Sequence, residues 1–227
     1  MKIYLDTGNI DEIIEASNSE ILDGVTTNPT LIAKEGRDFN TEIKEIIKIL
    51  RKNCSDDFTV SAEVTNLENS ETIVKQARVL SKIDKHILVK VPLTFEGLKA
   101  VKLLSKEKIR CNVTLCFSAN QALLAAKAGA WCVSPFVGRV DDTGHDGMEL
   151  IEEIRLVFDN YKFTTRILAA SIRSPEHILE CAKIGADIVT TPYSIFKKLY
   201  LNPLTDIGLE NFSKDWNEYQ KNLKSKK

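Results

Sequence analysis

The sequence lacks the residue patterns that several classes of protein require. The histidines His86, His145 and His177 lie far apart and do not have the spacing of metal ligands. The five cysteines contain no CxxC pair, which disfavours a metal site and a disulfide framework. We therefore interpret them as reduced core residues of a cytoplasmic protein, and we expect neither a metal nor a cofactor.

The chain also lacks an excess of charge of either sign and a long hydrophobic run. Its 31 basic and 32 acidic residues give a net charge of −1, which argues against a nucleic-acid or anionic membrane partner. No apolar run approaches the length of a membrane span. The N-terminal stretch reaches Asp6 too early for a secretory signal peptide, so we expect a cytoplasmic location.

What the sequence does have is a regular alternation of two patterns. Apolar runs that are typical of strands occur at 3–7, 24–28, 58–64, 87–92, 111–116, 131–137, 165–171 and 186–192. Each run is followed by a segment with helical periodicity, which predicts βαβ units and a parallel sheet. Eight such units predict a single (β/α)8 TIM barrel over residues 1–201. A doubly wound sheet is the alternative, although the first turn, "DTGNID", is not glycine-rich.

The segment 202–227 remains outside these eight units. Leu209, Phe212, Trp216, Tyr219 and Leu223 follow one another at three- and four-residue spacing, which predicts an extra C-terminal helix with one apolar stripe. The stripe could pack on its own barrel. We favour packing on a neighbouring subunit, because the eight helices of the barrel are already accounted for.

A lysine stands in the middle of the apolar run "HILVKVPLT", residues 86–94. Lysine is rarely buried without a specific reason. Since side chains alternate along a strand, Ile87, Val89 and Val91 would face the helices and Lys90 would point into the barrel.

The same alternation predicts further inward-facing residues on the other strands, most of them polar. They are Tyr4, Asp6, Ser61, Glu63, Asn112, Thr114, Ser134, Phe136, Ala169 and Ser171, whereas Leu115 is expected to face outward. Most of these residues lie near the C-terminal ends of their strands, where barrel enzymes carry their chemistry. An error of one residue in the register would reverse any of these assignments.

Two explanations fit a buried lysine. It can form a structural ion pair with a carboxylate, or it can act as a nucleophile, because desolvation favours the neutral amine that forms a Schiff base with a ketone. Asp6, Glu63 and Thr114 are candidates for the acid–base steps of that reaction.

A phosphate site is predicted beside these residues. Arg139 directly follows one strand, and Ser171 and Arg173 follow the next, just before a helix that Ser174 is expected to cap. A salt bridge from Arg139 to Asp141 or Asp142 within the loop is the alternative.

Several motifs occur in a specific order over nearly the whole length. They are "LDT" with Asp6, "DGVTTNPTLI" (23–32), "VSAEV" (60–64), "VKVP" (89–92), "NVTL" (112–115), "SPFVGRVDD" (134–142) and "AASIR" (169–173). With these motifs the sequence resembles the small transaldolases, which are class I aldolase-type barrels related to the bacterial fructose-6-phosphate aldolases. Gly8 departs from the alanine that is usual in these relatives.

The resemblance implies a role for each matching residue. Lys90 would form the Schiff base, Asp6 would be the general acid–base, and Glu63 and Thr114 would hold the catalytic water. The residues implied in substrate binding are Asn28, Asn112 and Ser134 for the hydroxyl groups, Phe136 in the pocket, and Arg139, Ser171 and Arg173 for the phosphate. The resemblance also implies a homo-oligomer, a pentamer or decamer, in which the C-terminal helix reaches a neighbouring subunit.

Two positions separate the subgroups of this family. The aldolases that release dihydroxyacetone carry Gln and Tyr at these positions. The transaldolases carry Glu and Phe, and this chain likewise has Glu63 and Phe136. The resemblance thus implies transfer of a dihydroxyacetone unit from sedoheptulose 7-phosphate to glyceraldehyde 3-phosphate, within the non-oxidative pentose phosphate pathway. A fructose-6-phosphate aldolase and a non-catalytic phosphosugar-binding barrel are the alternatives.

Overall fold

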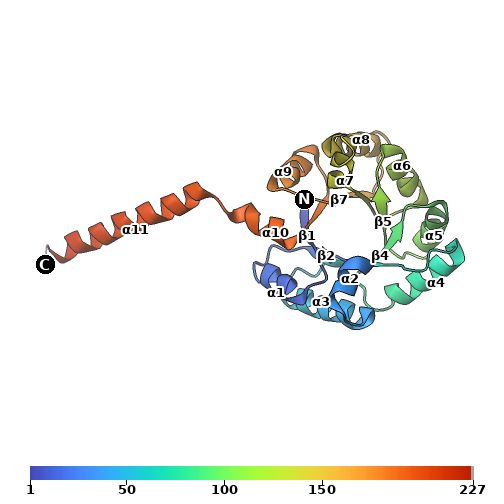
Figure 1. Cartoon of the computed structure of the whole chain (residues 1–227), viewed down its shortest axis with the longest axis horizontal. Coiled ribbons are helices and arrows are strands. Elements are labelled where there is room, and N and C mark those ends of the chain that lie inside the picture. The colour runs from blue at the N-terminus through green and yellow to red at the C-terminus, as the bar shows by residue number, and fades with distance from the viewer. Residues whose placement is uncertain (226–227) are drawn as a thin grey trace. The chain divides into compact units, whose positions relative to one another are not determined.

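A closed barrel of parallel strands forms the body of the computed structural model, which describes residues 1–225 (Figure 1). The eight strands in these residues are β1 (Lys2–Asp6), β2 (Gly24–Thr26), β3 (Thr59–Glu63), β4 (Ile87–Pro92), β5 (Cys111–Cys116), β6 (Cys132–Pro135), β7 (Arg166–Ala169) and β8 (Ile188–Thr191). They pair in chain order, and β8 pairs with β1 to close the ring. The predicted (β/α)8 barrel is confirmed.

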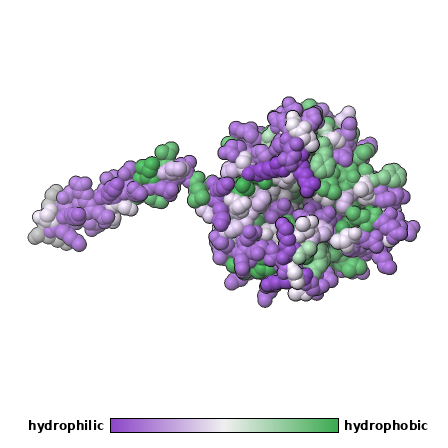
Figure 2. All heavy atoms as spheres, in the orientation of Figure 1, coloured by the Kyte–Doolittle hydropathy of each residue, from purple (hydrophilic) through white to green (hydrophobic). Residues whose placement is uncertain are grey.

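Helices surround this ring, and all of them except the last connect its strands (Figure 1). They are α1 (Ile10–Ser17), α2 (Pro29–Glu35), α3 (Phe39–Asn53), α4 (Ser70–Ser81), α5 (Phe95–Lys106), α6 (Ala119–Ala128), α7 (Val137–Asp141), α8 (Gly147–Asn160), α9 (Pro175–Ile184) and α10 (Tyr193–Phe196). Among the residues described, no helix combines the length and the apolar character needed to cross a bilayer. Figure 2 shows hydrophobic residues gathered over α5 and α6 on one face of the barrel.

Side-chain caps fix where several helices begin. The side chain of Asn9 accepts a hydrogen bond from the backbone of Glu12 at the start of α1. Ser174 caps α9 in the same way, with Pro175 in the first turn, as the sequence predicts. These caps lie within five residues of the preceding strand ends and help to fix the loops at the C-terminal edge of the barrel.

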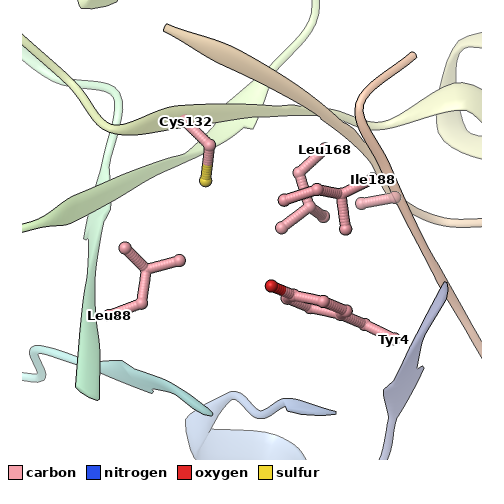
Figure 3. Close-up of a cluster of buried hydrophobic side chains, with 6 residues drawn as sticks. Tyr4, Leu88, Cys132, Leu168 and Ile188 are labelled. Carbon is pink, nitrogen blue, oxygen red and sulfur yellow. The ribbon is translucent and has the colours of Figure 1, made fainter. Parts of the chain in front are cut away.

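The N-terminal half of the barrel interior is filled with apolar side chains. Figure 3 shows Tyr4, Leu88, Cys132, Leu168 and Ile188 converging from five strands. The hydroxyl of Tyr4 accepts a hydrogen bond from Thr59 at 2.8 Å, and burial raises the pKa of Tyr4 above its usual value. This apolar floor closes the barrel below the polar residues near the strand ends.

The structure corrects two of the predicted side-chain directions. On β7, Leu168 and the following Ala170 point into the barrel, so the prediction for Ala169 is wrong by one residue. On β5, a register irregularity between Val113 and Cys116 places Leu115 at a φ of 61°, and Leu115 is 39% exposed instead of packed outward. A bulge interrupts strict alternation, which a two-residue period cannot anticipate.

The cysteines in the described part of the chain are free thiols. Cys111, Cys116, Cys132 and Cys181 are buried, as predicted, whereas Cys54 is only partly buried and is not a core residue. Burial raises the pKa of Cys111, Cys116 and Cys181 to about 12, so these thiols stay protonated and unreactive near neutral pH.

The chain divides into two compact units, and the second begins at Lys197, before the predicted boundary at residue 202. The second unit contains a short 3-10 helix, Lys197–Tyr200, and the long helix α11, Pro203–Lys224. Taken by itself, α11 carries Phe212, Trp216 and Tyr219 on one side, and the rings of Trp216 and Tyr219 lie 5.5 Å apart. The predicted C-terminal helix is therefore present.

Gly24 is required by the close packing of the barrel floor. A Cβ atom at this position would lie 2.6 Å from the carbonyl oxygen of Thr59 and 2.9 Å from the ring of Tyr4. We expect Gly24→Ala to lower the free energy of unfolding by about 1–3 kcal/mol, because the tight interior cannot accept the added methyl group. Urea denaturation checks this value.

Gly208→Ala in α11 is the matched control, because a methyl group added there would meet no neighbouring atom of residues 1–225 within 4 Å. Alanine is a better helix former than glycine, so this variant should be as stable as the parent or more stable. Equal stability of the Gly24→Ala variant and the parent would contradict our account of the floor.

Candidate active site

Lys90 lies near the C-terminal end of β4 with its side chain inside the barrel. Its Nζ lies 3.1 Å from Oε2 of Glu63 and donates a hydrogen bond to the carbonyl oxygen of Thr27, also at 3.1 Å. Glu63 on β3 is the register partner of Lys90, which sets the two side chains side by side. The lysine side chain is only 8% exposed, so its amine is held in a largely dry environment.

Asp6, at the end of β1, is the second carboxyl group of the site. Burial raises the pKa of Asp6, while the positive charge of Lys90 and a hydrogen bond from Thr26 act in the opposite direction. The Thr26 hydroxyl lies 2.8 Å from Oδ1 of Asp6 and 2.6 Å from the hydroxyl of Thr190. A carboxyl group with a raised pKa can exchange protons closer to neutral pH than an exposed aspartate can.

A chain of buried polar groups forms the wall beside Lys90. The hydroxyl of Ser134 donates to Oδ1 of Asn112 at 2.6 Å, and the amide of Asn112 donates to the hydroxyl of Ser61 at 3.3 Å. Thr114 differs from these groups, because its buried hydroxyl makes no hydrogen bond within residues 1–225. A buried polar atom without a partner indicates a position for a ligand or a water molecule.

The mouth of the barrel contains two adjoining pockets. The first, of about 170 Å³, is lined by Asp6, Thr26, Asn28, Lys90, Asn112, Ser134, Phe136, Arg139, Leu168, Ala170, Ser171 and Thr190. The second, of about 350 Å³, lies beside Glu63, Thr114 and Leu115. Both pockets include Asn28, Lys90, Phe136 and Arg139, so a ligand at Lys90 has access to both.

Local structure directs the residues at the rim. Oδ1 of Asn28 caps α2 by accepting from the backbone of Leu31 at 2.9 Å, which leaves its amide group to face the pockets. The guanidinium of Arg139 lies 5.9 Å from the ring centre of Phe136. Ala170 and Ser171 both line the first pocket, although consecutive residues of a regular strand face opposite sides. Ser171 has a left-handed backbone with a φ of 60°, which turns its side chain toward the pocket.

Arg173 is the predicted site residue that lines neither of these pockets. Both terminal nitrogens of its guanidinium donate to the carboxylate of Asp142. Its Nε would lie 2.6 Å from a Cβ on Gly138, so the glycine permits this approach. The sequence allows a salt bridge from Arg139 to Asp141 or Asp142 as an alternative. In the structure it is Arg173 that forms the salt bridge with Asp142.

Besides the apolar Leu168 and Ala170, sequence reasoning missed two polar residues of the first pocket, Thr26 and Thr190. Both lie on strands with consecutive threonines, "GVTTN" and "IVTT", and both face inward. The alternation rule would have found them if it had been applied to these two strands. In the described part of the chain, no group of His, Cys, Asp and Glu side chains is arranged to hold a metal ion.

The fold and the site define a class of (β/α)8 barrel with a buried lysine, paired with a carboxylate, at the C-terminal ends of its strands. Residues 3–223 match the Transaldolase/Fructose-6-phosphate aldolase family. The chain is 56% identical over 216 residues to a probable transaldolase of Clostridium kluyveri, which covers 95% of this chain and 97% of the relative. It is 55% identical over 221 residues to a probable transaldolase of Kosmotoga olearia, which covers 97% and 98%.

The chain therefore belongs to the Transaldolase/Fructose-6-phosphate aldolase family, and the names of its relatives indicate a transferase. Among solved structures, a 3-hexulose-6-phosphate synthase has a similar fold, with a TM-score of 0.63 and 18% identity. The match covers 88% of this chain and 98% of the synthase. At this low identity the similarity concerns the barrel alone.

The raised pKa of Asp6 has a consequence for stability. Ionisation of Asp6 is less favourable in the folded chain than in the unfolded chain. The parent should therefore lose stability as the pH rises from the unfolded pKa of about 4 through the higher folded pKa. Asp6→Asn removes this loss. The free energy of unfolding of the variant minus that of the parent should therefore increase from pH 4 to pH 8, as measured in urea titrations.

Asp142→Asn is the control with the opposite sign. The ion pair with Arg173 lowers the pKa of Asp142, so the parent gains stability from this carboxylate above its unfolded pKa and loses it as the pH falls. The asparagine variant should lack that gain at pH 8. A pH dependence of the same sign in both variants would contradict the assignment for Asp6.

Proposed function

We propose that this protein is a transaldolase that acts through a Schiff base on Lys90. It transfers a dihydroxyacetone unit from sedoheptulose 7-phosphate to glyceraldehyde 3-phosphate, giving erythrose 4-phosphate and fructose 6-phosphate, in the non-oxidative pentose phosphate pathway. The observation that carries the proposal is the buried Lys90 amine, which lies 3.1 Å from Glu63 and shares a pocket with Asp6. Family membership supports the same reaction type.

Imine formation would use the Glu63 side of the lysine. The neutral amine adds to the C2 ketone of the donor, and loss of water from the carbinolamine gives the protonated imine. Glu63 and the unpartnered hydroxyl of Thr114 face the second pocket, where they would hold the water molecule that carries these protons. When the amine loses its charge, Glu63 would exchange its ion pair with Lys90 for a hydrogen bond from this water molecule.

Carbon–carbon cleavage would use the Asp6 side. Asp6 takes the proton of the C4 hydroxyl, the C3–C4 bond breaks to release an aldose phosphate, and its electron pair moves into the imine to give an enamine. Addition of the acceptor aldehyde reverses these steps, with Asp6 returning the proton to the new hydroxyl. The raised pKa of Asp6 suits a group that must both accept and donate.

The remaining residues would hold the sugar. Asn28, Asn112 and Ser134 line the first pocket beside Lys90 and would bind the donor hydroxyls. Arg139 and Ser171 line the same pocket and would bind the phosphate. Arg173 would join them only after exchanging the carboxylate of Asp142 for the phosphate, since both its terminal nitrogens are bound there.

A test of the central step is reductive trapping on Lys90. Borohydride with fructose 6-phosphate should add one covalent adduct to the parent, located on Lys90 by peptide mass spectrometry. Lys90→Met should give no adduct and lower transfer activity at least about 1,000-fold, because no other group supplies the covalent intermediate. Lys99→Met, which removes an exposed lysine paired with Glu96, should be trapped like the parent.

The outcome of trapping also separates the reaction from simple sugar binding. A non-catalytic phosphosugar-binding barrel would keep the ligand in the Lys90→Met variant and show no turnover in the parent. Absence of any adduct on Lys90 in an active parent would exclude the Schiff-base mechanism.

Phe136 is proposed to favour transfer over release of dihydroxyacetone. Its ring lines both pockets and offers no proton, so the enamine waits for an acceptor. Phe136→Tyr would introduce a hydroxyl that can protonate the enamine, and the ratio of free dihydroxyacetone to transfer product should rise at least about tenfold. A coupled assay that measures both products checks the ratio. If the parent already releases dihydroxyacetone as fast as it transfers it, the aldolase alternative is the better description.

We also propose a cytoplasmic homo-oligomer, a pentamer or decamer, with phosphorylated sugars as its other partners and neither nucleic acid nor membrane among them. The free thiols suit a reducing compartment, and the apolar stripe of α11 would pack on a neighbouring subunit. Truncation after residue 201 should lower the number of subunits, obtained by light scattering as the measured mass divided by the mass of one chain, whereas Lys214→Gln on the polar side of α11 should leave this number unchanged. An unchanged number of subunits after truncation would contradict the role of this helix.

A further inference from the structure

A basic pocket lies at the end of the barrel opposite to the candidate active site. Arg110 directly precedes β5, Trp131 directly precedes β6, and Arg166 is the first residue of β7. Because the strands are parallel, these three residues share the N-terminal edge of the barrel, whereas Asp6, Glu63 and Lys90 lie toward the C-terminal edge.

The tryptophan holds the two arginines together. The guanidinium carbon of Arg166 lies 4.2 Å from the ring centre of Trp131, and that of Arg110 lies 5.6 Å from it. Arg110 also donates to the carbonyl oxygen of Lys85 at 2.7 Å, which fixes one side of its guanidinium. Arginine binds aromatic faces well, and its remaining N–H groups stay available for a ligand.

The arginines of this cluster are not held in salt bridges. Within residues 1–225, neither Arg110 nor Arg166 forms an ion pair with a carboxylate, whereas Arg37, Arg51, Arg78 and Arg173 all do. Burial and, in smaller part, the charge of Arg166 lower the pKa of Arg110, so the two cations disfavour each other. An anion between them would remove this cost.

A cavity of about 310 Å³ gives an anion access to these groups. Lys108, Arg110 and Arg166 supply three positive charges to its lining, and Ser105 and Thr164 bring hydroxyl groups. No acidic residue contributes to this lining in the part of the chain that the structure describes. Arginine forks and hydroxyl groups together match the oxygens of a phosphate group.

We propose that this pocket, which we call the floor pocket, binds the phosphate group of a small phosphate monoester. The three cations suit a doubly charged oxyanion, and the cavity is several times larger than the volume of roughly 30 Å³ that one water molecule occupies in the liquid. The remaining space accommodates the part of the molecule that carries the phosphate. The floor pocket is separate from the site at Lys90, so its occupation does not depend on the proposed transfer reaction.

Trp131 makes the proposal directly measurable. The chain has two tryptophans, so Trp216→Phe leaves Trp131 as the only one. In this background, inorganic phosphate and glycerol 3-phosphate are titrated at constant ionic strength, with sodium chloride as the blank. A saturable change in the fluorescence of Trp131 is expected with both. We expect glycerol 3-phosphate to bind more tightly than inorganic phosphate, and the reverse order would overturn the assignment to a monoester.

Variants then locate the bound phosphate. Arg110→Gln and Arg166→Gln should each raise the dissociation constant at least about tenfold, because each removes charge-assisted hydrogen bonds. Lys108→Gln keeps the arginine–tryptophan cluster intact and should raise it about threefold, so the test does not depend on folding of the arginine variants. Arg37→Gln, between α2 and α3, is the matched control and should change it less than twofold.

Arg139→Gln separates the two phosphate sites. It removes a charge from the pocket at Lys90 and should leave the Trp131 signal unchanged. Loss of the signal in this variant would overturn the proposal, and so would the absence of a saturable change in the Trp216→Phe protein. Dissociation constants of the Arg110→Gln, Arg166→Gln and Lys108→Gln variants that equal that of the Trp216→Phe protein would also overturn it. None of these results affects reductive trapping on Lys90, which tests the proposed transaldolase reaction.

Discussion

The structure is organised around the cost of burying one amine. Lys90 sits on a strand whose outward residues, Val89 and Val91, are completely buried, so its charge is stabilised only by what lies inside the barrel. Glu63 and the carbonyl oxygen of Thr27 provide this stabilisation, each at 3.1 Å. Such a pair gains little net free energy from burial. What it does provide is an amine that is held in a dry, fixed position.

The two ends of the barrel interior divide packing from chemistry. Tyr4, Leu88 and their neighbours fill the floor with apolar atoms, and Gly24 gives Tyr4 the space it needs. The layer above them, toward the strand ends, is polar. Ser134, Asn112 and Ser61 are joined by hydrogen bonds there, whereas the buried hydroxyls of Thr114 and Thr191 make none within residues 1–225. Rigid packing below therefore supports accurately placed polar groups above, which a preorganised site requires.

Strand alternation predicted most of this arrangement because the period of two is a local property of the chain. It placed Asp6, Glu63, Lys90 and Asn112 on the inner side without information about their neighbours. It failed for Leu115 and for Ala169, where a register irregularity and a one-residue shift change which side is inward. It also could not show that Arg173 is bound to Asp142, since that contact joins two loops 31 residues apart.

The sequence by itself determined the eight strand–helix units, the inward lysine and the motifs that link the chain to its family, because each depends on short-range pattern. Only the tertiary structure decided which groups touch. It joined Glu63 to Lys90 through strand register, gave Asp6 its raised pKa through burial, and stacked Arg110 and Arg166 on Trp131 across three strands. These outcomes arise from long-range contacts, which the closing of the barrel creates and which no local pattern contains.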